Sequence, residues 1–244
     1  MNEVKPYKQK ETGKKEQVAE MFDSIAGNYD FLNHFLSLNI DKIWRKKAIK
    51  IVKHLNPQYI LDVATGTGDF AIASLKLNPR KIEGIDISEK MIEIGRQKIE
   101  KLGKTNTITL SKGDSENISF PDNSFDLITV AFGVRNFENL EKGLSEMLRV
   151  LKPGGRVVIL EFSKPRKFPF KQLYKLYFKF ILPIMGKMVS RDNRAYSYLP
   201  ESVYAFPDFE HFTSVLTKIG FANASFKPLT FGIASMYSAQ KEKI

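Results

Sequence analysis

The sequence contains no cysteine, which excludes disulfide bonds, thiolate metal ligands and a cysteine nucleophile. Its three histidines, His34, His54 and His211, are scattered, so a histidine-based metal site is not expected either. No stretch approaches about 18 uncharged apolar residues, and the charged N-terminal stretch lacks the apolar core of a secretory signal. We therefore expect a cytoplasmic protein with no metal ion and no membrane-spanning helix.

The chain is long enough to bury a substantial core. Its length of 244 residues predicts one large domain, or one domain with an attached segment, and 43% of the residues are hydrophobic and 12% aromatic. We assign residues 1–57 to an N-terminal arm and a helical lid. Residues 58–244 form the main domain, which carries a basic amphipathic insertion at 164–206.

The N-terminal segment predicts two helices. Apolar residues recur at helical spacing from Gln17, and Gly27 is expected to end this first helix. Asp41 is expected to cap a second helix that runs to His54. These helices either pack on the edge of the main domain or cover its site as a lid.

The stretch Ile60–Phe70 predicts a buried strand, a glycine turn and a helix, in that order. Gly66 and Gly68 allow a ligand to approach the backbone N–H groups of the turn and the start of the helix. Asp86 follows Gly66 by twenty residues, where an acid can accept hydrogen bonds from ribose hydroxyls. A nucleoside-containing ligand is favoured over a turn with no ligand, although the turn also satisfies the dinucleotide fingerprint G-x-G-x-x-G/A.

Strands and helices alternate from Tyr59 onwards, which predicts an α/β fold with a mostly parallel sheet and helices on both faces. The last two strands, near 225–229 and 232–240, are separated by about two residues, too few for a crossover, so we expect an antiparallel hairpin. The other predicted elements are strands near 59–63, 81–86, 107–112, 125–131 and 156–162, and helices near 69–77, 88–102, 138–151 and 208–219.

Five parallel strands followed by an antiparallel hairpin resemble the S-adenosylmethionine-dependent methyltransferase fold, a Rossmann-like, mostly parallel seven-stranded sheet. The motifs agree in order: D-V-A-T-G-T-G-D resembles the cofactor loop, G-D-S follows the third strand, F-P-D-N-S-F-D leads into the fourth, and L-K-P-G-G opens the fifth. Thr65 stands where many relatives have glycine, a minor departure.

Four further stretches carry a narrower resemblance: F-D-S-I-A-G-N-Y-D-F-L-N (22–33), A-F-G-V-R-N-F (131–137), R-V-L-K-P-G-G-R-V-V-I-L-E-F-S-K-P (149–165) and A-Y-S-Y-L-P-E-S (195–202). All are similar to one family, the demethylmenaquinone and polyprenyl-benzoquinol C-methyltransferases of quinone biosynthesis. The similarity extends over nearly the whole chain.

The resemblance implies S-adenosylmethionine as the cofactor. Asp62 could balance the ammonium charge of the cofactor, or it could pin the glycine loop by accepting backbone hydrogen bonds. The simpler alternatives are a solvated charge for Asp86 and an ordinary turn residue for Asp114. The implied cofactor contacts are Gly66, Thr67 and Gly68 for the methionine end, Asp86 for the ribose, and Asp114 and Ser115 for the adenine.

Methyl transfer to a ring carbon requires a deprotonated ring hydroxyl and a group that stabilises the resulting oxyanion. The resemblance implies that Arg135 and Asn136, directly after the fourth strand, serve this purpose. Tyr29 and Asp30 are candidates for closing over the cofactor and touching the acceptor. The alternatives are a structural salt bridge for Arg135, a packed aromatic for Tyr29 and a cap for Asp30, and His34 is given no catalytic role.

The net charge of +11 is concentrated between Lys164 and Arg194, where nine basic residues accompany one acid. A lysine recurs every four residues from Lys167 to Lys179, and aromatic and aliphatic residues cover much of the remaining surface of that helix. This composition is typical of a helix at a membrane interface, which would suit a polyprenylated acceptor and an anionic membrane surface. Alternatively, the apolar face lines the substrate pocket and the lysines are solvated. With no recognition module present, nucleic acid is not expected as a partner.

We therefore predict a C-methyltransferase that converts demethylmenaquinol to menaquinol in menaquinone biosynthesis, peripherally associated with the inner face of the membrane. One alternative is methylation of 2-polyprenyl-6-methoxy-1,4-benzoquinol on the ubiquinone route. Others are a different small-molecule methyltransferase, a non-enzymatic cofactor binder and an NAD-dependent reductase. The sequence leaves open whether the protein forms a homodimer.

Overall fold

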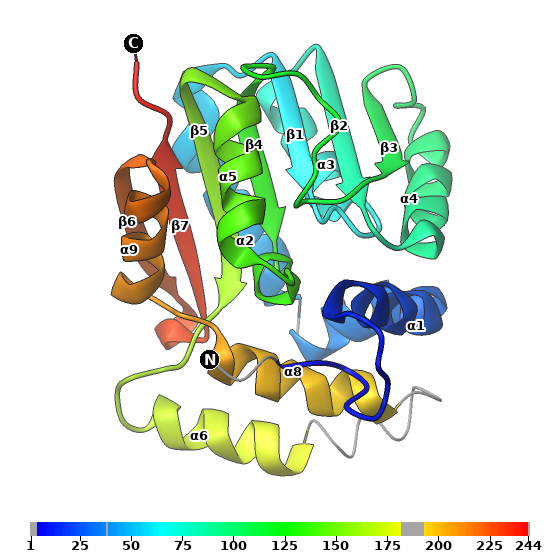
Figure 1. Ribbon diagram of the computed structural model, residues 1–244, viewed down its shortest axis with the longest axis vertical. Helices are drawn as coiled ribbons and strands as arrows, with labels where there is room; N and C mark the ends of the chain where they lie inside the picture. Colours follow the sequence, from blue (N-terminus) through cyan, green and yellow to red (C-terminus); the bar gives the residue numbers. More distant parts are fainter. Residues whose placement is uncertain (1–3, 38, 182–192, 244) are drawn as a thin grey trace.

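The computed structural model describes residues 4–37, 39–181 and 193–243, with the exception of the side chains of residues 28, 31–36, 181 and 193–196. Its centre is one seven-stranded sheet in the order β3-β2-β1-β4-β5-β7-β6 (Figure 1). Strands β1 to β5 are parallel, whereas β7 runs antiparallel to both β5 and β6. The predicted α/β fold with its C-terminal antiparallel pair is therefore confirmed. The strands are β1 (Tyr59–Val63), β2 (Lys81–Asp86), β3 (Ile108–Lys112), β4 (Phe125–Ala131), β5 (Leu151–Phe162), β6 (Ala222–Leu229) and β7 (Ala234–Gln240).

The strand order reverses at β1, which lies between β2 and β4. Val63 pairs in register with Ile85 on one side and Val130 on the other, so the carboxyl ends of these three strands lie level. The loops that follow them therefore emerge side by side. In open parallel sheets, ligands bind at this switch point, outside the carboxyl ends of the strands.

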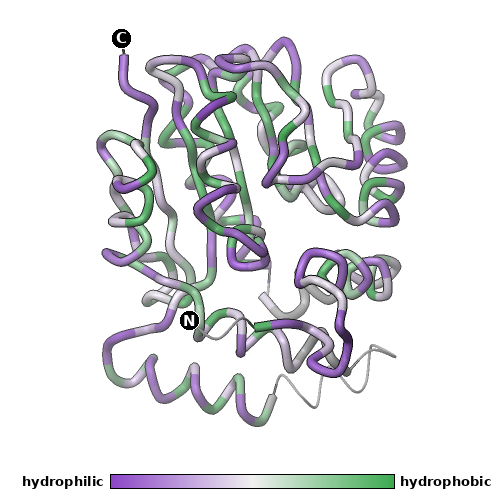
Figure 2. The backbone as a smooth tube through the Cα atoms, viewed as in Figure 1, coloured by the Kyte–Doolittle hydropathy of each residue, from purple (hydrophilic) through white to green (hydrophobic). Residues whose placement is uncertain are grey.

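Helices cover both faces of the sheet, as the alternating pattern predicts. On one face, α2 (Ile40–Val52), α3 (Asp69–Ser74) and α4 (Glu89–Lys101) pack on alternate residues of the central strands. On the other face, α5 (Leu140–Val150) and α9 (Glu210–Ile219) pack on the remaining ones. The central strands carry hydrophobic side chains on both faces, which explains their nearly continuous apolar sequences (Figure 2).

A third group of helices lies across the carboxyl edge of the sheet instead of on a face (Figure 1). We call this group, made of α1 (Lys14–Leu36), α6 (Phe170–Leu176), the π-helical turn η4 (Tyr177–Ile181) and α8 (Asn193–Ala205), the cap. The cap has its own hydrophobic cluster, with the buried residues Val18, Met21, Tyr174, Phe178 and Tyr198. The basic insertion and the first N-terminal helix, far apart in the sequence, are thus parts of one structural layer, whereas α2 packs on the sheet.

Two expectations for the N-terminal helices are wrong. Gly27 does not end the first helix, because α1 continues through it to Leu36. A glycine in a helix interior costs only about 1 kcal/mol, which the packing of the buried face of α1 outweighs. Asp41 does not cap α2 but lies in its first turn, where its carboxylate accepts hydrogen bonds from Ser37 Oγ at 2.6 Å and Arg45 Nη1 at 2.8 Å.

The predicted lysine-bearing helix of the insertion is present as α6 and η4, which carry Lys171, Lys175 and Lys179, whereas Lys167 precedes α6 and is not helical. Pro183, expected to interrupt the helix, lies outside the described residues. Within the described part of the chain, no helix combines the length and the apolar character needed to cross a membrane.

Candidate functional site

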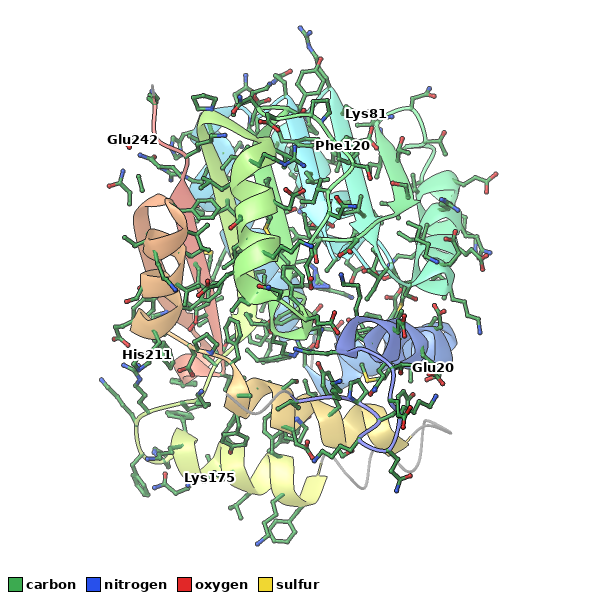
Figure 3. The ribbon with its side chains drawn as sticks, in the orientation of Figure 1. Glu20, Lys81, Phe120, Lys175, His211 and Glu242 are labelled. Carbon is green, nitrogen blue, oxygen red and sulfur yellow. The ribbon has the colours of Figure 1, made fainter. Side chains whose placement is uncertain are left out.

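The main cavity lies between the carboxyl edge of the sheet and α1 and encloses about 650 Å³, including the part open to solvent. Figure 3 labels Lys81 at the amino end of β2 and Glu20 on α1, which lies beyond the opposite, carboxyl edge of the sheet. The walls of the main cavity come from α1 and from the loops after β1, β2, β3 and β4. The lining residues used below are Lys15, Tyr29, Gly66, Asp86, Asp114, Ser115, Glu116 and Asn136.

The glycine loop after β1 has an unusual backbone conformation. Gly66 and Gly68 have φ values of 55° and 82°, in the left-handed region that favours glycine. A Cβ built on Gly66 meets no atom within 4 Å, and Gly66 lines the cavity, so a side chain there would project into the binding space. Glycine at position 66 therefore keeps the space beside the loop open for a ligand.

Asp86 ends β2 and faces this loop. Its Oδ2 accepts a hydrogen bond from the Gly66 N–H at 2.8 Å, and its Oδ1 accepts one from the Ser88 N–H at 2.9 Å. Burial raises the pKa of Asp86, and these backbone N–H groups oppose that rise. Each carboxylate oxygen retains a further lone pair with which it can accept from a ligand hydroxyl.

Asp62 is fully buried beneath the loop. It accepts hydrogen bonds from Thr65 Oγ1 at 2.5 Å, Thr129 Oγ1 at 2.6 Å and the Ala71 N–H at 3.1 Å. Burial raises the pKa of Asp62 to about 6 despite these donors. The structure therefore contains the loop-pinning contacts that were one of the two alternatives for Asp62, and Thr65, the departure in the loop sequence, supplies one of them.

A second, smaller cavity of about 380 Å³ adjoins the first and shares Tyr29 and Gly66 with it. Asp62, Thr67 and Asp69 line it, together with the buried Arg45 of α2. Arg45 Nη2 donates to Asp69 Oδ2 at 2.6 Å, which fixes the start of α3. Coulombic attraction to Arg45 and Lys98 outweighs burial and lowers the pKa of Asp69.

Thr67 links the glycine loop to the cap. Its hydroxyl donates to Asp30 Oδ1 of α1 at 2.5 Å and accepts from Lys98 Nζ of α4 at 3.1 Å. Lys98 also donates to Asp30 Oδ2 at 2.8 Å and to Asp69 Oδ1 at 2.6 Å. Asp30 thus joins α1 to the loop by its side chain and does not act as a helix cap.

The predicted adenine-binding residues follow β3, and α1 reaches them. Asp114 and Ser115 both line the main cavity. Lys15 Nζ lies 2.8 Å from Asp114 Oδ2 and 3.2 Å from Glu116 Oε2. Glu116 is buried and accepts from the Glu138 and Asn139 N–H groups at 2.9 Å and 3.0 Å, which ties the loop after β3 to the segment after β4.

Tyr29 is the predicted catalytic residue that lines both cavities. Burial raises the pKa of Tyr29 to about 12, and the nearby cations Arg135 and Arg45 act against this rise. The phenol therefore keeps its proton at neutral pH and can donate a hydrogen bond to a ligand. Its ring packs edge-on against Phe22, with ring centroids 5.9 Å apart.

Arg135 and Asn136 lie in the short helix η3 (Val134–Asn136) after β4. Arg135 Nη1 donates to Glu161 Oε1 at 2.8 Å and to the Phe132 carbonyl, and the side chain is only 8% exposed. This is the structural salt bridge held as the alternative, and Arg135 lines neither cavity. Asn136 does line the main cavity, donates from Nδ2 to the Phe132 carbonyl at 3.4 Å and has no partner for its buried Oδ1 among the described residues.

The structure adds four charged residues that sequence reasoning missed. Arg45 could have been found, because with Asp41 it forms an i,i+4 pair of opposite charge on the buried side of α2. Lys15, Lys98 and Glu116 gave no such signal, because their partners lie on other elements. Within the described residues, no group of acidic or histidine side chains could hold a metal ion.

Comparison with known proteins supports one assignment over nearly the whole chain. The model of the ubiE/COQ5 methyltransferase family matches residues 9–241. A "Demethylmenaquinone methyltransferase" of Bacteroides fragilis is 53% identical over 240 residues, which cover 98% of this chain and 97% of that one. A "Ubiquinone/menaquinone biosynthesis C-methyltransferase UbiE" of Geotalea daltonii is 47% identical over 232 residues, with 94% and 98% covered.

Solved structures agree on the fold. A SAM-dependent methyltransferase from Aquifex aeolicus superposes with a TM-score of 0.57 at 22% identity, covering 79% of this chain and 88% of that one. The [4+2]-cyclase SpnF superposes with a TM-score of 0.65 at 16% identity, covering 94% and 97%. The same fold thus occurs in proteins named for different reactions, so the fold alone does not define the chemistry.

Proposed function

This chain belongs to the ubiE/COQ5 methyltransferase family, and we propose from that premise that it methylates a ring carbon of demethylmenaquinol, with S-adenosylmethionine as the methyl donor. The products are menaquinol and S-adenosylhomocysteine. The observation that carries the choice of acceptor is the relative named "Demethylmenaquinone methyltransferase", which is 53% identical and aligned over 98% of this chain. Identity this high, without long unmatched segments, favours a shared acceptor.

The two adjoining cavities fit the donor molecule. The space next to Gly66 is open, and any side chain at this position would fill it and leave less room for the cofactor. Asp86 would accept from the ribose hydroxyls, Asp114 and Ser115 would contact the adenine, and the second cavity, next to Asp62 and Thr67, would hold the methionine end. When bound there, S-adenosylmethionine supplies an activated methyl group, so the protein has chiefly to align the acceptor and to exclude water.

The acceptor is the more demanding reactant, because a ring carbon is a weak nucleophile. A hydroquinone becomes nucleophilic at the neighbouring carbon when a ring hydroxyl loses its proton to a base or to water, and a donor near that oxygen stabilises the phenolate. After methyl transfer, the methylated carbon loses its hydrogen as a proton, which restores the aromatic ring. Tyr29 would donate a hydrogen bond from its protonated phenol to the phenolate oxygen of the acceptor. Asn136 would accept a hydrogen bond from the other ring hydroxyl at its amide oxygen, which has no partner among the described residues. Arg135 lies outside the lining of the two cavities, and its positive charge would favour the phenolate from there. Its pairing with Glu161 holds η3 in place.

Methylation of 2-polyprenyl-6-methoxy-1,4-benzoquinol is the second candidate, because other relatives carry names that include both quinones. One assay separates the two. The purified protein is incubated with methyl-labelled donor and, in parallel, with demethylmenaquinol or with the benzoquinol, and the quinones are extracted and separated. We expect label in the naphthoquinol product. Label confined to the benzoquinol would favour the second candidate, and label in neither would overturn the proposal.

We further propose that the cap docks on an anionic membrane at the cytoplasmic side, where a polyprenylated acceptor resides. The side chains of Leu173, Leu176 and Phe180 are 56%, 51% and 52% exposed and recur at helical spacing on α6 and η4. Lysines 171, 175 and 179 are exposed on the same two elements, Lys167 is exposed just before α6, and Figure 3 labels Lys175 at the outer side of the cap. Exposed apolar side chains flanked by lysines are the composition of helices that lie in the membrane interface.

Sedimentation with vesicles tests this docking. We expect the protein to pellet with vesicles that contain phosphatidylserine or phosphatidylglycerol, and less so with phosphatidylcholine alone or at high salt. Replacing Leu173, Leu176 and Phe180 by serine should abolish pelleting. The matched control is Leu102→Ser, because this leucine is 52% exposed after α4 and outside the cap. Absence of pelleting with every vesicle would overturn the docking proposal but not the activity.

A further inference from the structure

Buried polar atoms without partners gather between the cap and the sheet edge. Three of them are Arg135 Nε, Asn136 Oδ1 and the Tyr174 hydroxyl, for none of which the described residues provide a hydrogen-bond partner. Leaving a buried polar group unpaired costs about 1–3 kcal/mol, so native proteins keep such groups rare. A set of them in one region indicates that something other than this chain completes their hydrogen bonds.

Tyr174 comes from the cap, whereas Arg135 and Asn136 come from η3, the short helix that follows β4. Tyr174 is 7% exposed and packs in the cap cluster with Phe178. Val18 and Phe22 of the same cluster line the main cavity, so Tyr174 packs against the side chains that form one wall of that cavity. Burial raises the pKa of Tyr174, so the hydroxyl keeps its proton.

The chemistry of the three atoms defines the group that would satisfy them. The guanidinium Nε–H is a donor, the amide oxygen is an acceptor, and the phenol can act as either. The neighbouring Phe132 and Phe137 line the main cavity, and the cap cluster adds aromatic side chains. A flat ring with hydroxyl groups at two positions, each able to donate and to accept, matches this combination of apolar walls and polar atoms.

We propose that the Tyr174 hydroxyl binds one ring oxygen of the acceptor, so that the cap contributes a specificity-determining residue in addition to the sheet edge. The inference rests on the proposed function, since it takes the acceptor to be an aromatic ring that carries oxygen atoms. It deepens that function, because it makes α6 part of the acceptor site as well as part of the outer surface. The insertion then selects substrates by a hydrogen bond on its inner face.

The test is Tyr174→Phe, which removes only the hydroxyl. Kinetics are measured with a short-chain demethylated naphthoquinol, and binding of S-adenosylhomocysteine is measured by calorimetry. We expect kcat/KM for the acceptor to fall roughly 10-fold or more, as for loss of a hydrogen bond to a ligand, while cofactor affinity stays unchanged. With the corresponding naphthol, in which one hydroxyl is replaced by hydrogen, the variant and the wild type should differ less.

Stability separates this role from a structural one. Because the Tyr174 hydroxyl has no hydrogen-bond partner among the described residues, its removal should leave the melting temperature unchanged or raise it. The matched control is Tyr237→Phe, because the Tyr237 hydroxyl accepts from the Phe209 N–H at 2.8 Å. This control should lower the melting temperature without a selective loss in acceptor KM. An unchanged kcat/KM in Tyr174→Phe, in a wild-type background that methylates the quinol, would overturn the inference. Absence of methylation by the wild type would instead contradict the proposed function.

Discussion

Arg135 and Glu161 form a buried ion pair, 2.8 Å from Nη1 to Oε1, that joins η3, after β4, to the end of β5. Glu161 is completely buried and also accepts hydrogen bonds from the Arg135 and Phe162 N–H groups. Burial raises the pKa of Glu161, and the charge of Arg135 opposes that rise. Arg135, for which the family resemblance implies a catalytic role, therefore also has a structural role in the site.

Arg135→Ala should lower the free energy of unfolding by about 3–5 kcal/mol, because it leaves the Glu161 carboxylate buried without its partner. A double variant, Arg135→Met with Glu161→Leu, should recover most of this stability, since apolar pairs of similar volume replace buried ion pairs at little cost. Urea denaturation measures the stability, and methyl transfer is assayed on the same samples. If the double variant recovers activity together with stability, Arg135 has no catalytic role.

Asp86→Ala should weaken the binding of S-adenosylhomocysteine by roughly 10- to 100-fold, because hydrogen bonds to a charged group contribute about 1.5–3 kcal/mol. Calorimetric titration measures the change. The matched control is Glu83→Ala, three residues earlier on β2 and outside the residues that line the two cavities. Equal affinities for the Asp86 variant and the wild type would remove Asp86 from the cofactor site.

Gly133→Ala and Gly27→Ala should change stability in opposite directions. A Cβ on Gly133 would lie 2.5 Å from the Ala64 Cβ, and both residues line the main cavity. This variant should lose about 1–3 kcal/mol and bind cofactor less tightly, since overpacking displaces the loop. Gly27, inside α1, has no atom within 4 Å of a built Cβ, so alanine there should add about 0.5–1 kcal/mol. Thermal unfolding of both variants checks the prediction, and a stabilised Gly133→Ala would contradict it.

Asp62 should make stability depend on pH in a defined window. Its pKa rises from 3.8 to about 6 on folding, so the folded state retains the proton over a range in which the unfolded state has lost it. The stability of the wild type should therefore fall, relative to Asp62→Asn, as pH rises from about 4 to about 6, by about 3 kcal/mol at most, and should stay constant above that. Denaturation at several pH values measures the difference. A parallel pH dependence in both proteins would show that Asp62 does not titrate in this window.

Much of the fold was predictable because its signals are local. The alternation of apolar strands with amphipathic helices gave the parallel sheet, and the short connection before β7 gave the antiparallel pair. The errors occurred where a local signal was outweighed. Gly27 is a helix breaker by propensity, yet α1 passes through it because the buried face of α1 packs against α6, η4 and α8 within the cap.

The sequence by itself determined the elements, their order and the family, together with the glycine turn and the strand-end acids, because each of these depends on residues close together in the chain. Only the tertiary structure decided which distant side chains meet. It paired Arg135 with Glu161, placed Lys15 beside Asp114, and packed Tyr174 of the insertion into one cluster with Val18 of α1. The reason is physical: a hydrogen bond or an ion pair requires contact within a few ångströms. The Arg135–Glu161 and Lys15–Asp114 partners are 26 and 99 residues apart in the sequence, so their contact is set by how the elements pack.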